Sequence, residues 1–294
     1  VLTPDEGSKW ITIITGCSSI VCSSMGALVP VLGPRTGLLG LMACTCITLV
    51  GTLFFSDAAY RLSEENGFDP TKAKPKKAVS EKSNRFVEAR KLFRRVPALA
   101  ALFTETVMYQ SLGTILNVAF VTKLKATIPD DLARSAYTSR CFVGINVASA
   151  VVQLIIAPFV VARTEPSLLW KIVPVIPLGM LLYGRQTANP LTMFMVTWAT
   201  VKVLDYALRS VLTVLVYQPL DYESRYMGKE IIGVLGSRLG KSAVSLALSS
   251  MVTNASIIFA ASWVCGFGWL GSALWLSQII PSKKRAQEIV EERQ

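Results

Sequence analysis

Histidine is absent from the sequence, which removes the side chain that most often changes charge near neutral pH and most often ligates metal ions. The cysteines are few and fall inside apolar stretches, without the spacing typical of metal ligands. They are Cys17, Cys22, Cys44, Cys46, Cys141 and Cys265. We interpret them as small buried hydrophobic residues and expect neither a disulfide framework nor a metal or other cofactor.

Charged residues are also scarce, at 17% of a chain that is 52% hydrophobic. A soluble domain carries about 25% charged residues, and one core could not enclose so many apolar side chains. The composition therefore predicts an integral membrane protein. The formal charge of +11 could indicate a nucleic-acid partner. We favour the bias of basic residues toward the inner side of a membrane, and expect no nucleic acid.

Eight apolar stretches are near or above the length of about 20 residues that crosses a bilayer as a helix. We expect an all-α, polytopic transmembrane helix bundle with spans at roughly 10–32, 38–55, 96–121, 136–162, 168–184, 189–217, 229–253 and 256–280. The predicted organisation is two transmembrane helices (1–59), a basic linker (60–95), a six-helix bundle (96–280) and a basic tail (281–294). A turn at Gly33, Pro34 and Arg35 separates the first two spans.

The distribution of lysine and arginine predicts the orientation of these spans. Nineteen lie on the side that holds the linker and the tail, and five lie on the opposite side. The linker and the tail are therefore expected to face the cytosol or its equivalent. For the linker itself, a structural connection is favoured, and a patch for anionic lipid or a partner stays open.

One polar face lies within an apolar span, where each charge costs roughly 2.5–3.5 kcal/mol. Lys202, Asp205 and Arg209 follow helical spacing and share this face. Glu105 is the other acid near them within the spans. Two interpretations stay open here: a site for an anion in a central cavity, or interhelical salt bridges that lock the bundle.

Arg238 and Lys241 form a second cationic face, with Ser242, Ser245 and Ser249 continuing its polar stripe. No acid lies near them in the sequence, so an anion site is the favoured interpretation for this pair. Four aromatic residues of the last span are instead interpreted as an interfacial belt: Trp263, Phe267, Trp269 and Trp275.

Three neighbouring motifs carry a family resemblance. They are Tyr217-Gln218-Pro219-Leu220-Asp221, Gly228-Lys229-Glu230-Ile231-Ile232 and Gly236-Ser237-Arg238-Leu239-Gly240-Lys241-Ser242. Together they resemble the signature of the nucleotide transporter family, the ATP/ADP translocases of plastids and intracellular bacteria, which are related to the major facilitator superfamily. The resemblance implies a major-facilitator-like fold of twelve spans in two halves. This chain would supply the last two spans of the first half and the complete second half.

The resemblance implies a transporter of nucleotides or another phosphorylated anion that works by alternating access and is not an enzyme. It would reside in a plastid membrane or a bacterial inner membrane. The residues expected to bind substrate are Lys202, Arg209, Lys229, Arg238 and Lys241. Glu105 and Asp205 would form a coupling or charge network, and Pro219 and Gly228 would act at a hinge.

The sequence departs from the family pattern at two places. Thr213-Val214 stands where a Lys-Glu pair is expected, and Asn117 replaces a glutamate. These changes keep an alternative open, in which the chain is a transport-inactive subunit that docks in a larger membrane complex through its apolar flanks, basic linker and tail.

Overall fold

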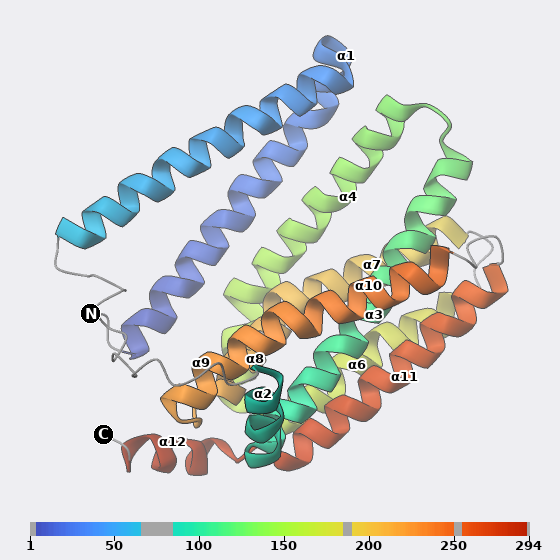
Figure 1. Cartoon of the computed structure of the whole chain (residues 1–294). Coiled ribbons are helices and arrows are strands. Elements are labelled where there is room, and N and C mark those ends of the chain that lie inside the picture. Colours follow the sequence, from blue (N-terminus) through green and yellow to red (C-terminus); the bar gives the residue numbers. More distant parts are fainter. Residues whose placement is uncertain (1–3, 66–84, 185–189, 250–254, 293–294) are drawn as a thin grey trace.

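The computed structural model describes residues 4–65, 85–184, 190–249 and 255–292, and these residues contain helices and no β-strand (Figure 1). The helices are α1 (Pro4–Glu65), α2 (Arg85–Arg95), α3 (Pro97–Thr127), α4 (Asp131–Val151), α5 (Ala157–Arg163), α6 (Pro166–Gly184), α7 (Pro190–Leu204), α8 (Ser210–Tyr217), α9 (Tyr222–Ile231), α10 (Ser237–Ser249), α11 (Ala255–Ile279) and α12 (Lys283–Glu291). The predicted all-α class is confirmed.

Three short π-helical segments lie inside longer helices. They are η1 (Val152–Ile156), η2 (Asp205–Arg209) and η3 (Ile232–Gly236), and each joins the helix before it to the helix after it without a break. A π-helical segment inserts one extra residue into a turn, and such segments occur frequently at functional sites. Two of them, η2 and η3, lie within or directly before the charged faces predicted from the sequence.

Five helices of the described residues are long and apolar enough to cross a membrane, by length and composition. They are Ile20–Leu62, Asp131–Arg163, Pro166–Gly184, Ser224–Ser249 and Ser256–Ile279. The protein is therefore an integral membrane protein built from a helix bundle. The count of eight spans, and the boundaries of the four predicted parts, stay predictions.

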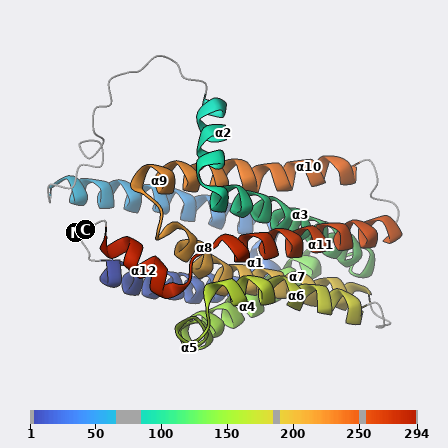
Figure 2. The ribbon, with the colours of Figure 1, turned by 90° about the horizontal axis from the view of Figure 1, so that it is seen from below.

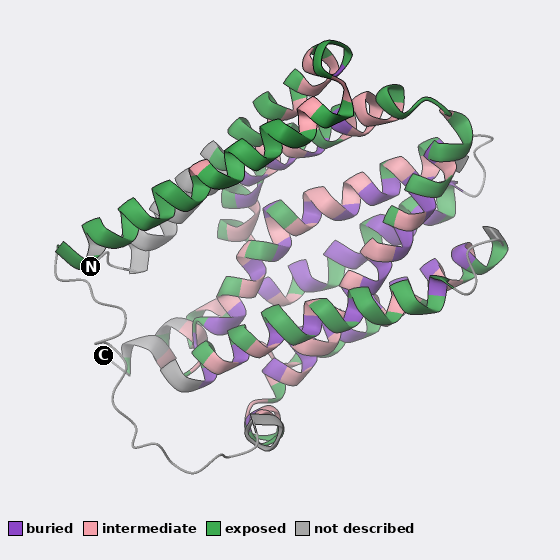
Figure 3. Ribbon diagram, turned by 45° about the horizontal axis from the view of Figure 1, so that its top comes forward, coloured by how far each residue is buried: buried purple, intermediate pink, exposed green. Residues whose placement is uncertain are grey.

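The long helix α1 is a hairpin rather than one rod. Gly37 has a φ of 67°, which a residue with a side chain rarely adopts, and the two legs run back along one another from this point (Figure 1). The turn expected at Gly33 therefore comes later, because the helix continues through Pro34. The hairpin packs on α4 and leaves most of its apolar surface exposed (Figure 3).

The exposed hairpin corrects the interpretation of three cysteines. Cys22, Cys44 and Cys46 all lie on α1 and are exposed, so the expectation that they are buried is wrong. Cys17 lies outside the residues whose side chains the structure describes. The error arose because an apolar stretch predicts a helix in lipid, but it does not say whether another helix covers a given face.

The core of the molecule is centred on α3, which packs against α7, α10 and α11. Glycines permit the close approach of the chain segment from α9 to α10. A Cβ atom on Gly240 would lie 2.6 Å from the carbonyl oxygen of Val107, and one on Gly228 would lie 2.8 Å from Leu99. Because lipid offers little hydrophobic drive for helix association, such close backbone contacts are a main source of packing energy.

Segments predicted to lie on one side of the membrane gather at one end of the bundle. In Figure 1, α2, the start of α9 and α12 lie at this end, and the turn of α1 and the α3–α4 connection lie at the other; Figure 2 again shows α9 and α12 at one shared end. We call these the linker end and the turn end. The predicted topology, including the side that faces the cytosol, stays a prediction.

Candidate functional site

The strongest polar contact in the bundle joins Arg209 of η2 to Glu105 of α3. The guanidinium donates from Nε to Oε1 over 2.9 Å and from Nη2 to Oε2 over 2.7 Å, and Glu105 is completely buried. Nη1 of Arg209 also donates to Oδ1 of Asp205 over 3.1 Å. Arg209 is therefore held between two carboxylates of the same chain.

Neighbouring side chains occupy the remaining positions around this ion pair. The Thr106 hydroxyl accepts from Nη2 of Arg209 over 2.9 Å, and the Tyr109 ring lies 4.3 Å from the guanidinium carbon. Trp269 of α11 donates its indole N–H to Oε1 of Glu105 over 2.8 Å. The cluster thus joins α3, η2 and α11, as expected for an interhelical lock.

Trp269 corrects part of the aromatic-belt interpretation. Its side chain is completely buried and hydrogen-bonded, whereas Phe267 and Trp275 of the same helix are exposed. The sequence signal that could have identified it is helical spacing, since Trp269, Ala273 and Leu276 follow one face of α11 and all three are buried.

Lys202 is a cation within the bundle that enters no ion pair with a described residue. It lies near the end of α7 and is half-buried, with its Nζ 5.9 Å from the centre of the Tyr206 ring. The charge of Asp205, three positions further along the chain, attracts it, and a smaller repulsion comes from Lys241 of α10.

The two cations of α10 lie deep in the span and away from its packing face. Gly240, between them, faces α3, whereas the side chains of Arg238 and Lys241 are exposed. Lys241 is about 12 Å along its helix from the turn end, and Lys202 is about 18 Å from the same end. Among the ion pairs of the described residues, none includes Lys202, Arg238 or Lys241.

Lys229 lies apart from Arg238 and Lys241. It is exposed on α9, near the linker end, and about 18 Å of helix separates it from Lys241. Gly228, predicted at a hinge, lies inside α9 and packs on Leu99. Pro219 is buried in the short link between α8 and α9. The roles predicted for these three residues stay predictions.

Two arginines, Arg225 and Arg95, hydrogen-bond to the link around Pro219 and to the start of α9. The sequence analysis identified both only as basic residues on the linker side. Arg225 donates to three carbonyl oxygens at the end of α8 and in the link, those of Tyr217, Gln218 and Leu220. Arg95, at the end of α2, donates to the Ser224 hydroxyl over 2.7 Å and to Asp221 over 3.4 Å. The basic helix α2 is thereby attached to the start of α9.

Asp221 is the N-cap of α9, because its carboxylate accepts from the backbone N–H of Ser224 over 3.1 Å. Hydrogen bonds from Ser224, together with the nearby charge of Arg95, hold the pKa of Asp221 below its ordinary value.

The positions that depart from the expected family pattern lie away from this link. Thr213 donates to the carbonyl oxygen of Arg209, and Asn117 is exposed on α3.

Comparison with known proteins identifies the family of this bundle. The sequence model described as "TLC ATP/ADP transporter" matches residues 8–280. The chain belongs to the TLC ATP/ADP transporter family. This family consists of transporters rather than enzymes, and both the resemblance and the expected class are confirmed.

Two curated relatives of this TLC family member are named "ADP,ATP carrier protein 1", from Chlamydia muridarum (strain MoPn / Nigg) and from Chlamydia trachomatis serovar D (strain ATCC VR-885 / DSM 19411 / UW-3/Cx). Each is 24% identical over 277 residues, which cover 85% of this chain and 52% of the relative. The chain therefore spans about half the length of the curated relatives that it matches. No solved structure matches it.

Proposed function

We propose that this TLC family chain is part of a transporter that moves nucleotides, or other phosphorylated anions, across a membrane by alternating access. The observation that carries the proposal is a set of three cations within the helices, Lys202, Arg238 and Lys241, that enter no ion pair with a described residue. Membership of the ATP/ADP transporter family and the names of the curated relatives support nucleotides as the substrate class.

Cations without an ion pair inside a membrane span are costly, so they are most stable when an anion lies beside them. A nucleotide supplies several negative oxygens in a row and can contact cations from different helices at once. Lysine is suited to this task because its ammonium is a compact charge on a flexible stem. Binding therefore compensates charges that the described part of the protein leaves unpaired.

Asp205 gives this site a means of coupling to the bundle. Its carboxylate is hydrogen-bonded to Arg209 and also attracts Lys202. A phosphate group that takes over Lys202 would leave Asp205 free to interact more strongly with Arg209. Within this proposal Arg209 acts through the Glu105 lock, as part of the charge network, rather than as the main contact of the substrate.

The helices that carry the charges contain features suited to a change of shape. Lys202 lies three residues before η2, and Arg238 lies two residues after η3. Helices bend at π-helical segments, so bending at η2 would move Lys202 and bending at η3 would move Arg238. The link at Pro219 joins these two helices at the linker end, where Arg225 and Arg95 hold it.

The proposed location is a plastid membrane or a bacterial inner membrane, with the linker end facing the cytosol or its equivalent. The bacterial sources of the curated relatives support a bacterial membrane. The linker end contains most of the lysine and arginine residues outside the spans, as the positive-inside bias requires. We propose no direct partner other than lipid and the transported anion.

The test is uptake of labelled ATP into liposomes that contain the purified full-length protein and are preloaded with ADP. The wild type is expected to show saturable uptake, and Lys241→Gln to reduce it at least tenfold. Lys171→Gln is the matched control, because Lys171 is an exposed lysine of α6 and has no ion pair among the described residues. Absence of saturable uptake for ATP, ADP and inorganic phosphate would reject transport and favour the docking alternative.

A further inference from the structure

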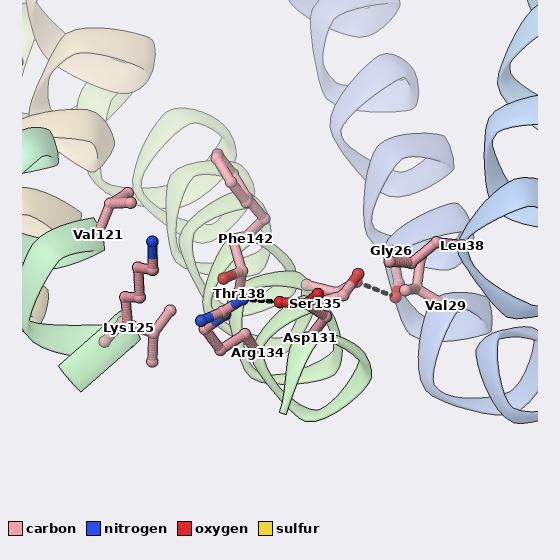
Figure 4. Close-up of a pocket in the computed structure, with 12 residues that line it drawn as sticks. Gly26, Val29, Leu38, Val121, Lys125, Asp131, Arg134, Ser135, Thr138 and Phe142 are labelled. Carbon is pink, nitrogen blue, oxygen red and sulfur yellow. Dashed lines mark hydrogen bonds and ion pairs between the residues drawn. The ribbon is translucent and has the colours of Figure 1, made fainter. Parts of the chain in front are cut away.

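A cavity of about 690 Å³ opens at the turn end between α1, α3 and α4, separate from the central lysines (Figure 4). This volume lies within the roughly 300–1,000 Å³ of small-molecule sites. Lys125 of α3 and Arg134 of α4 both line it, and their nitrogen atoms lie in the space between the two helices in Figure 4. Gly26 of α1 forms the opposite wall.

One face of α4 supplies most of the polar lining. Asp131, Arg134, Ser135 and Thr138 follow helical spacing and all line the cavity. Arg134 is paired with Asp131, and this ion pair leaves other guanidinium N–H groups of Arg134 without a partner among the described residues. No hydrogen bond of the Ser135 or Thr138 hydroxyl lies within the described part of the chain, so both can donate to a ligand.

Lys125 contributes a charge that is not compensated in this way. It is exposed at the end of α3 and enters no ion pair with a described residue. The cavity therefore contains two cations, one acid and two available hydroxyl donors. Compact anions with several oxygens, above all phosphate groups, are the ligands that this donor set fits.

The cavity lies beside the turn of the α1 hairpin. Gly26 on one leg and Leu38, directly after the turn at Gly37, both line it. A solute that entered between α1 and α3 from the turn end would meet this cavity first.

We propose that this cavity is a phosphate-binding site at the mouth of the transport pathway, in which Lys125 and Arg134 hold the anion and Ser135 and Thr138 complete its hydrogen bonds. Asp131 sets the affinity, because it neutralises part of the charge of Arg134. The inference rests on the proposed function for its place in a pathway, whereas the binding itself can be measured without transport. The ligand's phosphate belongs either to a soluble anion or to a lipid headgroup.

The test is equilibrium binding of labelled pyrophosphate to the purified full-length protein. It is performed in a Lys241→Gln background, so that the central site contributes little. The double variant Lys125→Gln/Arg134→Gln is expected to raise the dissociation constant at least tenfold. Asp131→Asn is expected to lower it at least threefold, and this gain of affinity cannot come from a folding defect. Lys123→Gln, which changes a nearby lysine of α3 that does not line the cavity, is expected to have no effect.

Equal dissociation constants for all four proteins, or no pyrophosphate binding in any of them, would overturn the soluble-anion form of the site. Native mass spectrometry then distinguishes the lipid source. A phospholipid retained by the Lys241→Gln protein and lost in the triple variant supports a headgroup site, and its retention in both excludes that form as well. Failure of ATP uptake with the expected binding pattern would reject the proposed function and leave this site standing.

Discussion

At the scale of single residues, the charges within the helices of this bundle are of two kinds. Arg209 is compensated by Glu105 and Asp205 within the chain. Lys202 and Lys241 instead enter no ion pair with a described residue. We infer that the first kind holds helices together and the second kind holds substrate.

The lock predicts a large stability loss when one partner is removed. Arg209→Met leaves the Glu105 carboxylate buried without its cation, which costs about 3–5 kcal/mol. Thermal unfolding of the detergent-solubilised full-length protein should show a clear drop in Tm. The double variant Glu105→Gln/Arg209→Met should recover much of that loss, and Lys241→Gln should leave Tm nearly unchanged. Equal Tm for Arg209→Met and wild type would contradict the lock.

At the scale of helices, packing of α10 on α3 depends on backbone contact at Gly240. A methyl group there meets the carbonyl oxygen of Val107 and the side chain of Gln110, so Gly240→Ala must push the helices apart at a cost of about 1–3 kcal/mol. The matched control is Gly233→Ala, because a Cβ atom there meets nothing within 4 Å. Unfolding midpoints in denaturant measure both variants, and equal destabilisation by the two would refute this packing argument.

The attachment of α2 to α9 gives a second prediction for helices. Asp221→Ala removes the N-cap of α9, which costs about 0.5–2 kcal/mol, and also the acceptor of Arg95. Protease cleavage in the linker should therefore become faster in Asp221→Ala, whereas Asp221→Asn keeps a capping oxygen and should show a smaller change. Indistinguishable cleavage rates for wild type and Asp221→Ala would contradict the attachment.

The lowered pKa of Asp221 fixes the sign of its pH dependence. The contribution of its carboxylate to stability is fully present above the ordinary aspartate pKa of about 4, and is lost as pH falls through the lower value of the folded state. The difference in cleavage rate between wild type and Asp221→Asn should shrink below pH 4. A difference that grows on acidification would show that another group controls the link.

At the scale of the whole molecule, the helical class could be predicted because a long apolar stretch in lipid must satisfy its backbone internally. The cationic faces could be predicted from helical spacing. The partner of Arg209 could not, because Glu105 lies 104 positions away and the sequence left a lock and an anion site equally open. The exposed cysteines and the buried Trp269 were misjudged for the same reason, since neighbours of a helix face come from distant segments.

In the proposed function, Lys202, Arg238 and Lys241 hold the phosphate groups of a transported anion. The most direct test of this role is the dissociation constant of ATP for the purified full-length protein, compared between wild type, Lys241→Gln and Lys171→Gln. Loss of one charge-assisted contact of about 1.5–3 kcal/mol predicts at least tenfold weaker binding for Lys241→Gln and no change for Lys171→Gln. Equal ATP affinity in all three proteins would contradict the account.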